Sequence, residues 1–284
     1  MADTAARAAP GWDCHVHVFD TQTPVRAGHY VPREHPLPAI EAVAAAHGIG
    51  HLVLVQPSVY GSDHRLLLQA LRAGGGRHRG VAAADAAASD RELDELHAAG
   101  VRGVRFNLVS PAGHAGDPQA ALKAVAPRLR ERGWHVQWYV APERLPDLAA
   151  WQADAALGRG LVFVLDHLAG LHATLPRAAP AWVAARALAD RGAWVKLSGW
   201  YRLGASEPYP GLHDTLARVA DWFGPRTVWG SDWPHTSFPP DRLPAYDSLA
   251  EPVRAALGEA TLHAARVTHP PRLYDFPSVS KETA

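Results

Sequence analysis

Histidine and aspartate follow three apolar runs that lie far apart in this sequence. His15 and His17 close the first run, His167 closes a run past the middle, and Asp232 closes a run near the end. Imidazole and carboxylate groups can activate water, polarise a carbonyl or bind zinc. A lone histidine is more often structural, so the set indicates function only if the fold brings its members together.

The spacing within the first string suggests how two of these rings are presented. Residues two apart in a strand share a face, so His15 and His17 should point to one side while Val16 points to the other. If the runs are parallel strands of one barrel, their carboxyl ends converge, and His15, His17, His167 and Asp232 should meet there. We therefore predict that these four residues are catalytic.

Other polar residues stand at equivalent points along the chain, and we interpret them as substrate-binding residues: Ser58, Arg105, Asn107, Tyr139, Arg202 and His235. Burying an arginine without a partner is costly. Arg105 therefore needs an internal carboxylate or a substrate anion, and an ion pair with a neighbouring loop is the alternative for it and for Arg202.

The elements that must position these residues follow from the pattern of apolar residues. Short, β-branched runs alternate with stretches of helical period. The expected strands are Gly11–His17, His51–Gln56, Gly80–Ala84, Val101–Asn107, His135–Val140, Leu161–His167, Trp194–Gly199 and Thr227–Asp232. The expected helices are Pro38–His47, Ser62–Ala73, Ser89–Ala99, Pro118–Arg132, Pro142–Leu157, Ala181–Arg191 and Gly211–Phe223.

Start and stop signals support these helices. The string from Ser89 to Glu92 has the form of a capping box. Gly133, Gly192 and Gly224 stand just past expected helix ends, where a left-handed residue is favoured.

Eight strands that alternate with helices predict a single-domain (β/α)₈ TIM barrel over residues 11–276. An open doubly wound sheet is the alternative, but no Gly-x-Gly-x-x-Gly follows the first strand. Residues 1–10 are expected to form a disordered tail and residues 277–284 a flexible one.

Composition limits the partners. The chain has 28 basic and 28 acidic residues, so net charge gives no attraction to nucleic acid or anionic membranes. It shows no signal peptide and no apolar stretch long enough to span a membrane, and its one cysteine, Cys14, suits a reducing compartment. We expect a cytoplasmic protein that binds a small molecule, with a homo-oligomer possible.

Several strings together resemble the amidohydrolase superfamily. A His-x-His on strand 1, a His ending strand 6 and an Asp ending strand 8 have that superfamily's pattern. The strings from Gly103 to Asn107, Lys196 to Ser198 and Trp229 to His235 are similar to its lactonase branch, which includes 2-pyrone-4,6-dicarboxylate lactonase. The resemblance runs from about Asp13 to Phe276.

The resemblance implies a hydrolase that opens a small lactone. Asp232 would activate water, while His15, His17 and His167 would face the growing charge on the carbonyl oxygen. Arg105 and Arg202 would clamp a substrate carboxylate, and Ser58 and Tyr139 would donate hydrogen bonds. The branch's further arginines have no match in residues 108–111 or 168–170. The resemblance therefore implies a substrate with fewer carboxylates, or one bound in a different pose.

The resemblance also bears on metals. Members with two metals use a Lys or Glu on strand 4 and a His on strand 5, where this chain has Arg105 and Tyr139. His135 stands at the wrong end of strand 5 to be a ligand. We therefore expect no binuclear centre and favour a metal-free site. The alternative is one Zn²⁺ or other divalent ion held by His15, His17, His167 and Asp232.

Three other functions stay open at this stage. One is a metal-dependent decarboxylase of the same superfamily, and another is a hydrolase of neutral sugar lactones. The third is a barrel that serves only as a binding or scaffold protein, against which the intact His and Asp set argues.

Overall fold

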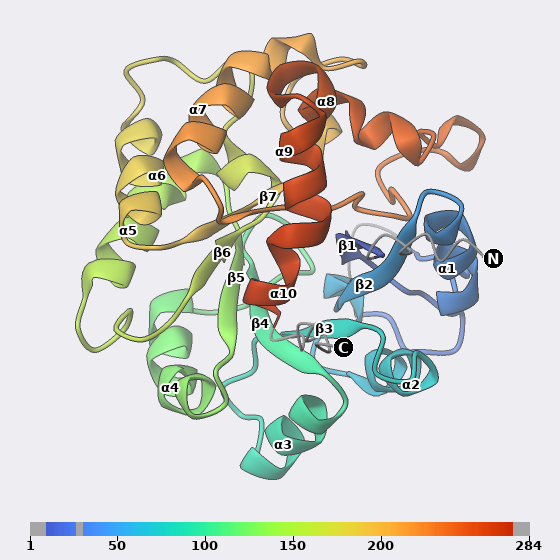
Figure 1. Ribbon diagram of the computed structural model, residues 1–284. Coiled ribbons are helices and arrows are strands. Elements are labelled where there is room, and N and C mark those ends of the chain that lie inside the picture. The colour runs from blue at the N-terminus through green and yellow to red at the C-terminus, as the bar shows by residue number, and fades with distance from the viewer. Residues whose placement is uncertain (1–9, 27–30, 275–284) are drawn as a thin grey trace, which may run out of the picture.

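A computed structural model describes residues 10–26 and 31–274. Eight parallel strands pair in chain order, each followed by helix, and form a (β/α)₈ barrel, as predicted. Figure 1 shows the strands at the centre with the helices around them. The expected tails at residues 1–10 and 277–284 lie outside the described part, apart from Pro10.

The strands are short and mostly begin where the apolar runs begin. They are β1 (Gly11–Val16), β2 (Ile49–Val55), β3 (Arg79–Ala83), β4 (Val101–Asn107), β5 (His135–Tyr139), β6 (Phe163–Leu165), β7 (Trp194–Leu197) and β8 (Thr227–Trp229). Strands β6 and β8 end before the predicted His167 and Asp232. Both residues have positive φ angles, 50° and 63°, which an extended strand does not allow.

The first seven helices lie close to their predicted ranges, and three further helices, for which no range was predicted, follow β8. The helices are α1 (Leu37–Ala45), α2 (Arg65–Ala73), α3 (Asp90–Ala98), α4 (Pro118–Glu131), α5 (Leu145–Ala153), α6 (Pro180–Asp190), α7 (His213–Phe223), α8 (Glu251–Leu257), α9 (Glu259–His263) and α10 (Pro270–Leu273). The capping box before α3 is present, with the Ser89 side chain accepting from the Glu92 backbone. Gly133, Gly192 and Gly224 all have positive φ.

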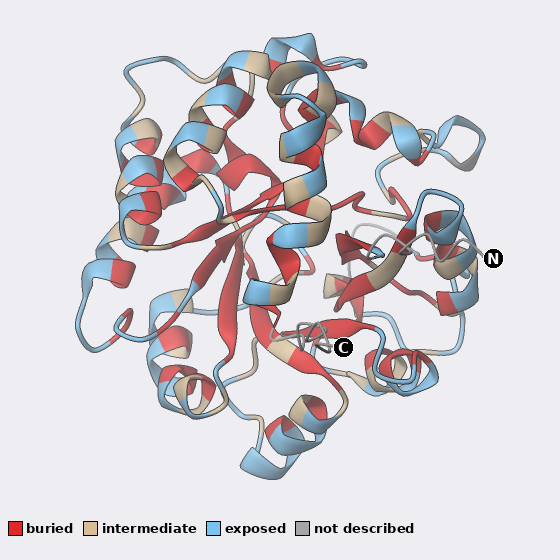
Figure 2. Ribbon diagram, in the orientation of Figure 1, coloured by how far each residue is buried: buried red, intermediate tan, exposed pale blue. Residues whose placement is uncertain are grey.

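Two apolar layers hold the fold together. One fills the space between strands and helices, and the other fills the barrel interior with residues such as Trp12, Val53, Val81 and Val228. In Figure 2 the strands and the inner helix faces are buried, while the outer helix faces are exposed. Within the described ranges, no helix is long and apolar enough to cross a membrane.

The C-terminal segment closes the barrel at the N-terminal ends of the strands. Tyr274, just after α10, stacks on Trp12 at the start of β1 with ring centroids 6.0 Å apart. Its backbone oxygen accepts a hydrogen bond from Arg79 at the start of β3. The opposite end, where the strands finish, is left for the site.

The seam between β8 and β1 is closed by the segment that follows β8. The Asp232 backbone N–H donates to the His15 carbonyl at 2.8 Å, and the His17 N–H donates to the Trp233 carbonyl at 2.9 Å. In β1, three steps from Asp13 to Val16 match two steps in β2, which is a β-bulge. The hydrogen bonds that close the barrel therefore also bring Asp232 to the histidines of β1.

Candidate active site

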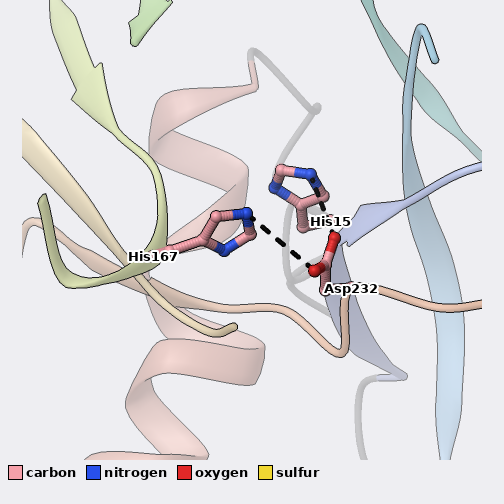
Figure 3. Close-up of side chains that lie close together, drawn as sticks. All are labelled: His15, His167 and Asp232. Atoms are coloured by element: carbon pink, nitrogen blue, oxygen red, sulfur yellow. Dashed lines mark ion pairs between the residues drawn. The ribbon is translucent and has the colours of Figure 1, made fainter. Parts of the chain in front are cut away.

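The four predicted catalytic residues meet at the carboxyl ends of the strands. Asp232 Oδ1 lies 3.6 Å from His15 Nε2 and 3.5 Å from His17 Nε2, and Asp232 Oδ2 lies 3.9 Å from His167 Nε2. Figure 3 shows the rings of His15 and His167 reaching the Asp232 carboxylate from different parts of the barrel. We call these four residues the mouth cluster.

The backbone near the mouth cluster adopts rarely populated conformations. His167, Leu168 and Ala169 have φ angles of 50°, 51° and 58°, and Asp232 has 63°. Such left-handed residues cost free energy and persist only where surrounding contacts hold them. Asp13 supplies two of these contacts beside β8: it accepts from the Ser231 backbone N–H at 2.9 Å and from the Tyr246 hydroxyl at 2.8 Å.

Two glycines that pack closely against His15 and His167 also fix the positions of these residues. A Cβ at Gly199 would lie 2.4 Å from His167 Nδ1, and a Cβ at Gly230 would lie 2.7 Å from His15 Cβ. A larger residue at either position would push a mouth-cluster ring aside. Glycine is therefore required here by the close approach of neighbouring atoms.

Hydrogen bonds orient the other histidines. His17 Nδ1 lies 2.7 Å from the Val55 carbonyl oxygen, which can only accept, so Nδ1 carries the proton. In a neutral ring, His17 Nε2 then faces Asp232 with a lone pair. His167 Nδ1 lies 2.9 Å from Ser198 Oγ. Burial lowers the pKa of His167 to about 4, so its ring is neutral near pH 7.

Asp232 is held by two residues of the loop after β7. The Tyr201 hydroxyl donates to Asp232 Oδ2 at 2.6 Å, and Arg202 Nε donates to the same oxygen at 2.8 Å. Burial opposes ionisation, but the Arg202 guanidinium holds the pKa of Asp232 well below its usual value. Burial and Asp232 raise the pKa of Tyr201, so its hydroxyl stays protonated.

This pairing changes the interpretation of Arg202. The sequence suggested a clamp for a substrate carboxylate, with a loop ion pair as the alternative. In the structure, Arg202 contacts Asp232, Ser237 Oγ and the Tyr201 hydroxyl. Arg202 therefore has a carboxylate partner within the protein and also lines the groove.

A second set of charged groups lies deeper in the barrel. Asp166 Oδ2 accepts from Arg105 Nε at 2.8 Å and from Gln137 Nε2 at 3.1 Å. Lys196 Nζ donates to Gln137 Oε1 at 2.7 Å and lies 3.5 Å from Asp166 Oδ1. We call Arg105, Gln137, Asp166 and Lys196 the interior cluster.

The interior cluster answers the question of what pairs with Arg105. Of the partners that the sequence left open, the structure provides an internal carboxylate, Asp166, which directly follows β6 and does not come from the arginine's own strand. Burial opposes ionisation of Asp166, yet the charges of Lys196 and Arg105 hold its pKa well below the usual value. A substrate anion is therefore not needed to balance Arg105, although Arg105 still lines the groove.

His15 joins the two clusters. Its Nδ1 lies 3.3 Å from Asp166 Oδ1 and 3.3 Å from Lys196 Nζ, while its Nε2 points toward Asp232. Burial, followed by the charge of Lys196, lowers the pKa of His15 well below its usual value. The ring is therefore neutral, and its buried Nε2 has no hydrogen-bond partner.

The remaining residues that were predicted to bind substrate differ in their contacts. Asn107 donates to Ser58 Oγ at 2.7 Å, and its Oδ1 accepts from two backbone N–H groups of the following loop. Tyr139 lies edge-on to His167, with ring centroids 4.9 Å apart, and beneath Arg105. His235 packs beside Tyr201 and Phe238 and is not among the residues that line the groove.

A narrow groove of about 60 Å³ opens over the mouth cluster. The residues that line it are His17, Pro57, Ser58, Arg105, Asn107, Ser110, Tyr139, His167, Arg202, Asp232 and Thr236. All but one of the residues predicted to bind substrate line this groove, which leaves His235 as the exception.

A metal ion fits part of the predicted ligand set. Among the described residues, the one group of three or more possible ligands is His15, His167 and Asp232, whose ligand atoms lie within 4.8 Å of one another. The unpartnered Nε2 of His15 supports the fit. His17 stands outside this group, although its Nε2 is 3.5 Å from Asp232. These residues could hold one ion.

Sequence reasoning gave no role to Asp166, Lys196, Gln137 or Tyr201. Strand alternation contained a signal for two of them. Gln137 lies two residues before Tyr139 on β5, and Lys196 lies two residues before Ser198, so each faces the barrel interior. Tyr201 lies in a loop, where no such periodicity exists.

Comparison with known proteins identifies the family to which this chain belongs. Residues 12–276 match the amidohydrolase family, and the chain belongs to that family. It is 32% identical to a 2-pyrone-4,6-dicarboxylate hydrolase of Comamonas testosteroni, over 82% of this chain and 79% of the relative. It is 30% identical to a 4-sulfomuconolactone hydrolase of Rhizobium radiobacter, over 95% and 94% of the two chains.

A solved structure agrees with this relationship. A Pseudomonas putida protein assigned as a 2-pyrone-4,6-dicarboxylic acid hydrolase superposes with a TM-score of 0.81 at 32% identity. The match covers 95% of this chain and 99% of that one. The family predicted from the His and Asp strings is therefore confirmed.

Proposed function

We propose that this protein opens a small, carboxylate-bearing lactone by water attack at the mouth cluster. The observation that carries the proposal is the state of Asp232. One of its oxygens is held by Tyr201 and Arg202, and the other faces His15 and His17. The named lactone hydrolases among the relatives support the same reaction.

The chemistry needs a proton acceptor beside the attacking water. As the water oxygen bonds to the ester carbonyl carbon, Asp232 Oδ1 takes the water's proton. The ring C–O bond then breaks, and Asp232 returns the proton to the departing alkoxide, which gives a hydroxy acid. Because its pKa is held low, Asp232 is a weak base but returns the proton readily.

The carbonyl oxygen must be stabilised as its charge grows. Tyr139 lines the groove and can direct its hydroxyl toward that oxygen. We assign the substrate carboxylate to Arg105, through the part of its fork beyond the Nε that Asp166 accepts from.

We favoured a metal-free site from the sequence, and the donor set also fits one ion. A divalent ion held by His15, His167 and Asp232 would supply Lewis-acid polarisation of the carbonyl when bound. In either case, Tyr201 and Arg202 orient Asp232, and Ser198 and Val55 orient the rings of His167 and His17.

A screen of lactones with a pH indicator tests the proposal. Hydrolysis releases acid, and we expect turnover of at least one carboxylate-bearing lactone. A chelator arm and elemental analysis separate the metal-free site, with activity kept, from the one-ion site, with activity lost and about one metal per chain. Release of CO₂ with no lactone turnover would contradict the proposal and indicate a decarboxylase.

A further inference from the structure

The proton on the His15 ring has two possible positions, and the interior cluster decides between them. His15 Nδ1 lies 3.3 Å from Asp166 Oδ1 and 3.3 Å from Lys196 Nζ. If Nδ1 donates to Asp166, Nε2 keeps a lone pair that can bind a metal ion. If Nδ1 accepts from Lys196, Nε2 carries the proton and has no lone pair for a metal. The choice between these neighbours therefore sets what His15 offers to the mouth cluster.

A series of hydrogen bonds with fixed directions leads to His15. It begins at Arg105, which can only donate and whose Nε donates to Asp166 Oδ2. The same oxygen accepts from Gln137 Nε2, so the other end of that amide, Oε1, accepts from Lys196 Nζ at 2.7 Å. The Asp166 carboxylate, 3.5 Å away, stabilises Lys196 as an ammonium, which has N–H donors and no lone pair. Lys196 therefore also donates to His15 Nδ1.

The ion pair between His15 and Asp166 is not a hydrogen bond in this arrangement. Asp166 Oδ1 is buried and has no hydrogen-bond partner among the described residues, although the His15 ring is 3.3 Å away. His15 Nδ1 therefore does not donate to Asp166, and the neutral ring carries its proton on Nε2. This nitrogen lies 3.6 Å from Asp232 Oδ1 (Figure 3), so its proton faces the carboxylate and stabilises the negative charge there.

The two rings of the His-x-His string therefore carry opposite tautomers. His17 Nδ1 donates to the Val55 carbonyl oxygen at 2.7 Å, so its Nε2 faces Asp232 with a lone pair. His15 has the reverse arrangement, because the group that contacts its Nδ1 is a donor, Lys196, and not a carbonyl oxygen. A metal-binding histidine usually donates its second ring N–H to a carboxylate or a carbonyl. His17 meets that condition, and His15 does not.

We propose that Lys196 is a positioning residue that holds His15 as the Nε2–H tautomer and so withholds its lone pair from a metal ion. The inference rests on the proposed function and deepens it, because it assigns the metal-free form to that hydrolytic site. Without Lys196, the Nδ1 proton would have Asp166 Oδ1 as its acceptor. His15 could then join His167 and Asp232 as a metal ligand. Lys196 therefore selects between the two forms that the donor set allows.

Nitrogen NMR of protein labelled at histidine determines the tautomer, because protonated and unprotonated ring nitrogens have different chemical shifts. The protein is first stripped of metal with a chelator, and a His15→Gln variant assigns the His15 signals. In the wild type, the proton should be on His15 Nε2. In Lys196→Met it should move to Nδ1, where it faces Asp166. His17, which donates to the Val55 carbonyl, should keep its tautomer in both proteins and serves as the internal standard.

Zinc binding measures the consequence of the tautomer. Competition with a chromophoric chelator gives the affinity of the metal-free protein for Zn²⁺. Lys196→Met should bind Zn²⁺ roughly tenfold or more tightly than the wild type, in the range by which residues behind the ligands change metal affinity. Lys123→Met, at an exposed position of α4, is the matched control and should bind Zn²⁺ as the wild type does. Melting temperatures establish that both variants fold.

Neither readout uses turnover, so this test is separate from the lactone screen. A proton on His15 Nδ1 in the wild type would overturn the inference, and so would an unchanged tautomer in Lys196→Met. Equal affinities of the wild type and Lys196→Met for Zn²⁺ would also overturn it. If Lys196→Met does not fold, the tautomer of the wild-type ring decides alone. A protein that opens no lactone but shows the expected tautomers and zinc affinities would lose the proposed function and keep this role of Lys196.

Discussion

The mouth cluster and the interior cluster use the same kinds of residue for different purposes. Each is built around one buried aspartate whose pKa is held low by neighbouring charge. Asp166 is enclosed by Arg105, Gln137 and Lys196 and does not line the groove, whereas Asp232 is held on one side only and does.

The comparison shows how one barrel separates stability from chemistry. A buried charge whose charged neighbours all belong to the protein supports the fold, because removing one of those neighbours leaves the charge uncompensated. A buried charge with one oxygen left facing a groove can act on a substrate. His15 touches both clusters, so the interior cluster also orients one member of the mouth cluster.

The largest effect on activity is expected from Asp232→Asn. Loss of the proton acceptor should lower kcat by roughly 10²–10⁴-fold. Initial rates of hydrolysis of a carboxylated lactone measure this loss in kcat. Asp214→Asn, on the exposed surface, is the matched control. If a folded Asp232→Asn protein kept wild-type turnover, Asp232 would have no part in the mechanism. The proposed difference between a catalytic Asp232 and a structural Asp166 would then be wrong.

The main expected effect of Asp166→Asn is a lower free energy of unfolding. The variant keeps the volume but leaves Lys196 and Arg105 buried without their carboxylate, which should cost roughly 3–5 kcal/mol in the free energy of unfolding. Urea denaturation measures the loss. Adding Lys196→Met should recover part of it, because one uncompensated charge is removed. A loss below about 1 kcal/mol would show that the interior cluster does not support the fold.

Arg105→Met tests the residue that lines the groove and also belongs to the interior cluster. We expect kcat/KM for a carboxylated lactone to fall roughly 10–100-fold, in the range of a charge-assisted hydrogen bond, and that for a neutral lactone to fall far less. Arg105→Lys should recover only part, because a point charge does not reproduce the fork. Equal losses on both lactones, with a lower Tm, would assign Arg105 to Asp166 alone and favour a neutral sugar lactone.

The last prediction concerns stability alone and rests on His135, at the start of β5. Burial lowers its pKa to about 3, so the folded protein stays unprotonated there while the unfolded chain gains a proton below about pH 6.5. Its contribution to stability is therefore complete above pH 6.5 and falls as pH drops from 6.5 toward 3.

His135→Gln measures this contribution. The stability difference between wild type and variant should fall by roughly 1.4 kcal/mol per pH unit between about pH 6 and pH 4. Denaturation curves at several pH values give the slope, and His263→Gln at an exposed position serves as the control. A slope of zero would mean that water reaches His135 and that the barrel interior is not closed.

Local patterns in the sequence were enough to predict the barrel and the membership of the mouth cluster. Strand and helix periods depend on neighbouring residues, and the ends of parallel strands in a barrel must converge. The meeting of His15, His17, His167 and Asp232 followed from these two rules, although His167 and Asp232 lie just beyond the ends of β6 and β8. The capping box at Ser89 is equally local and was predicted for the same reason.

Only the tertiary structure decided the partners. Arg105 and Asp166 are 61 residues apart, Lys196 and His15 are 181 apart, and Arg202 meets Asp232 through a loop with no periodic signal. Which cation pairs with which carboxylate depends on side-chain reach across the barrel, and the same residue types would allow several pairings. The sequence therefore determined which groups stand at the strand ends, while packing across the barrel decided which carboxylate is enclosed and which one faces the groove.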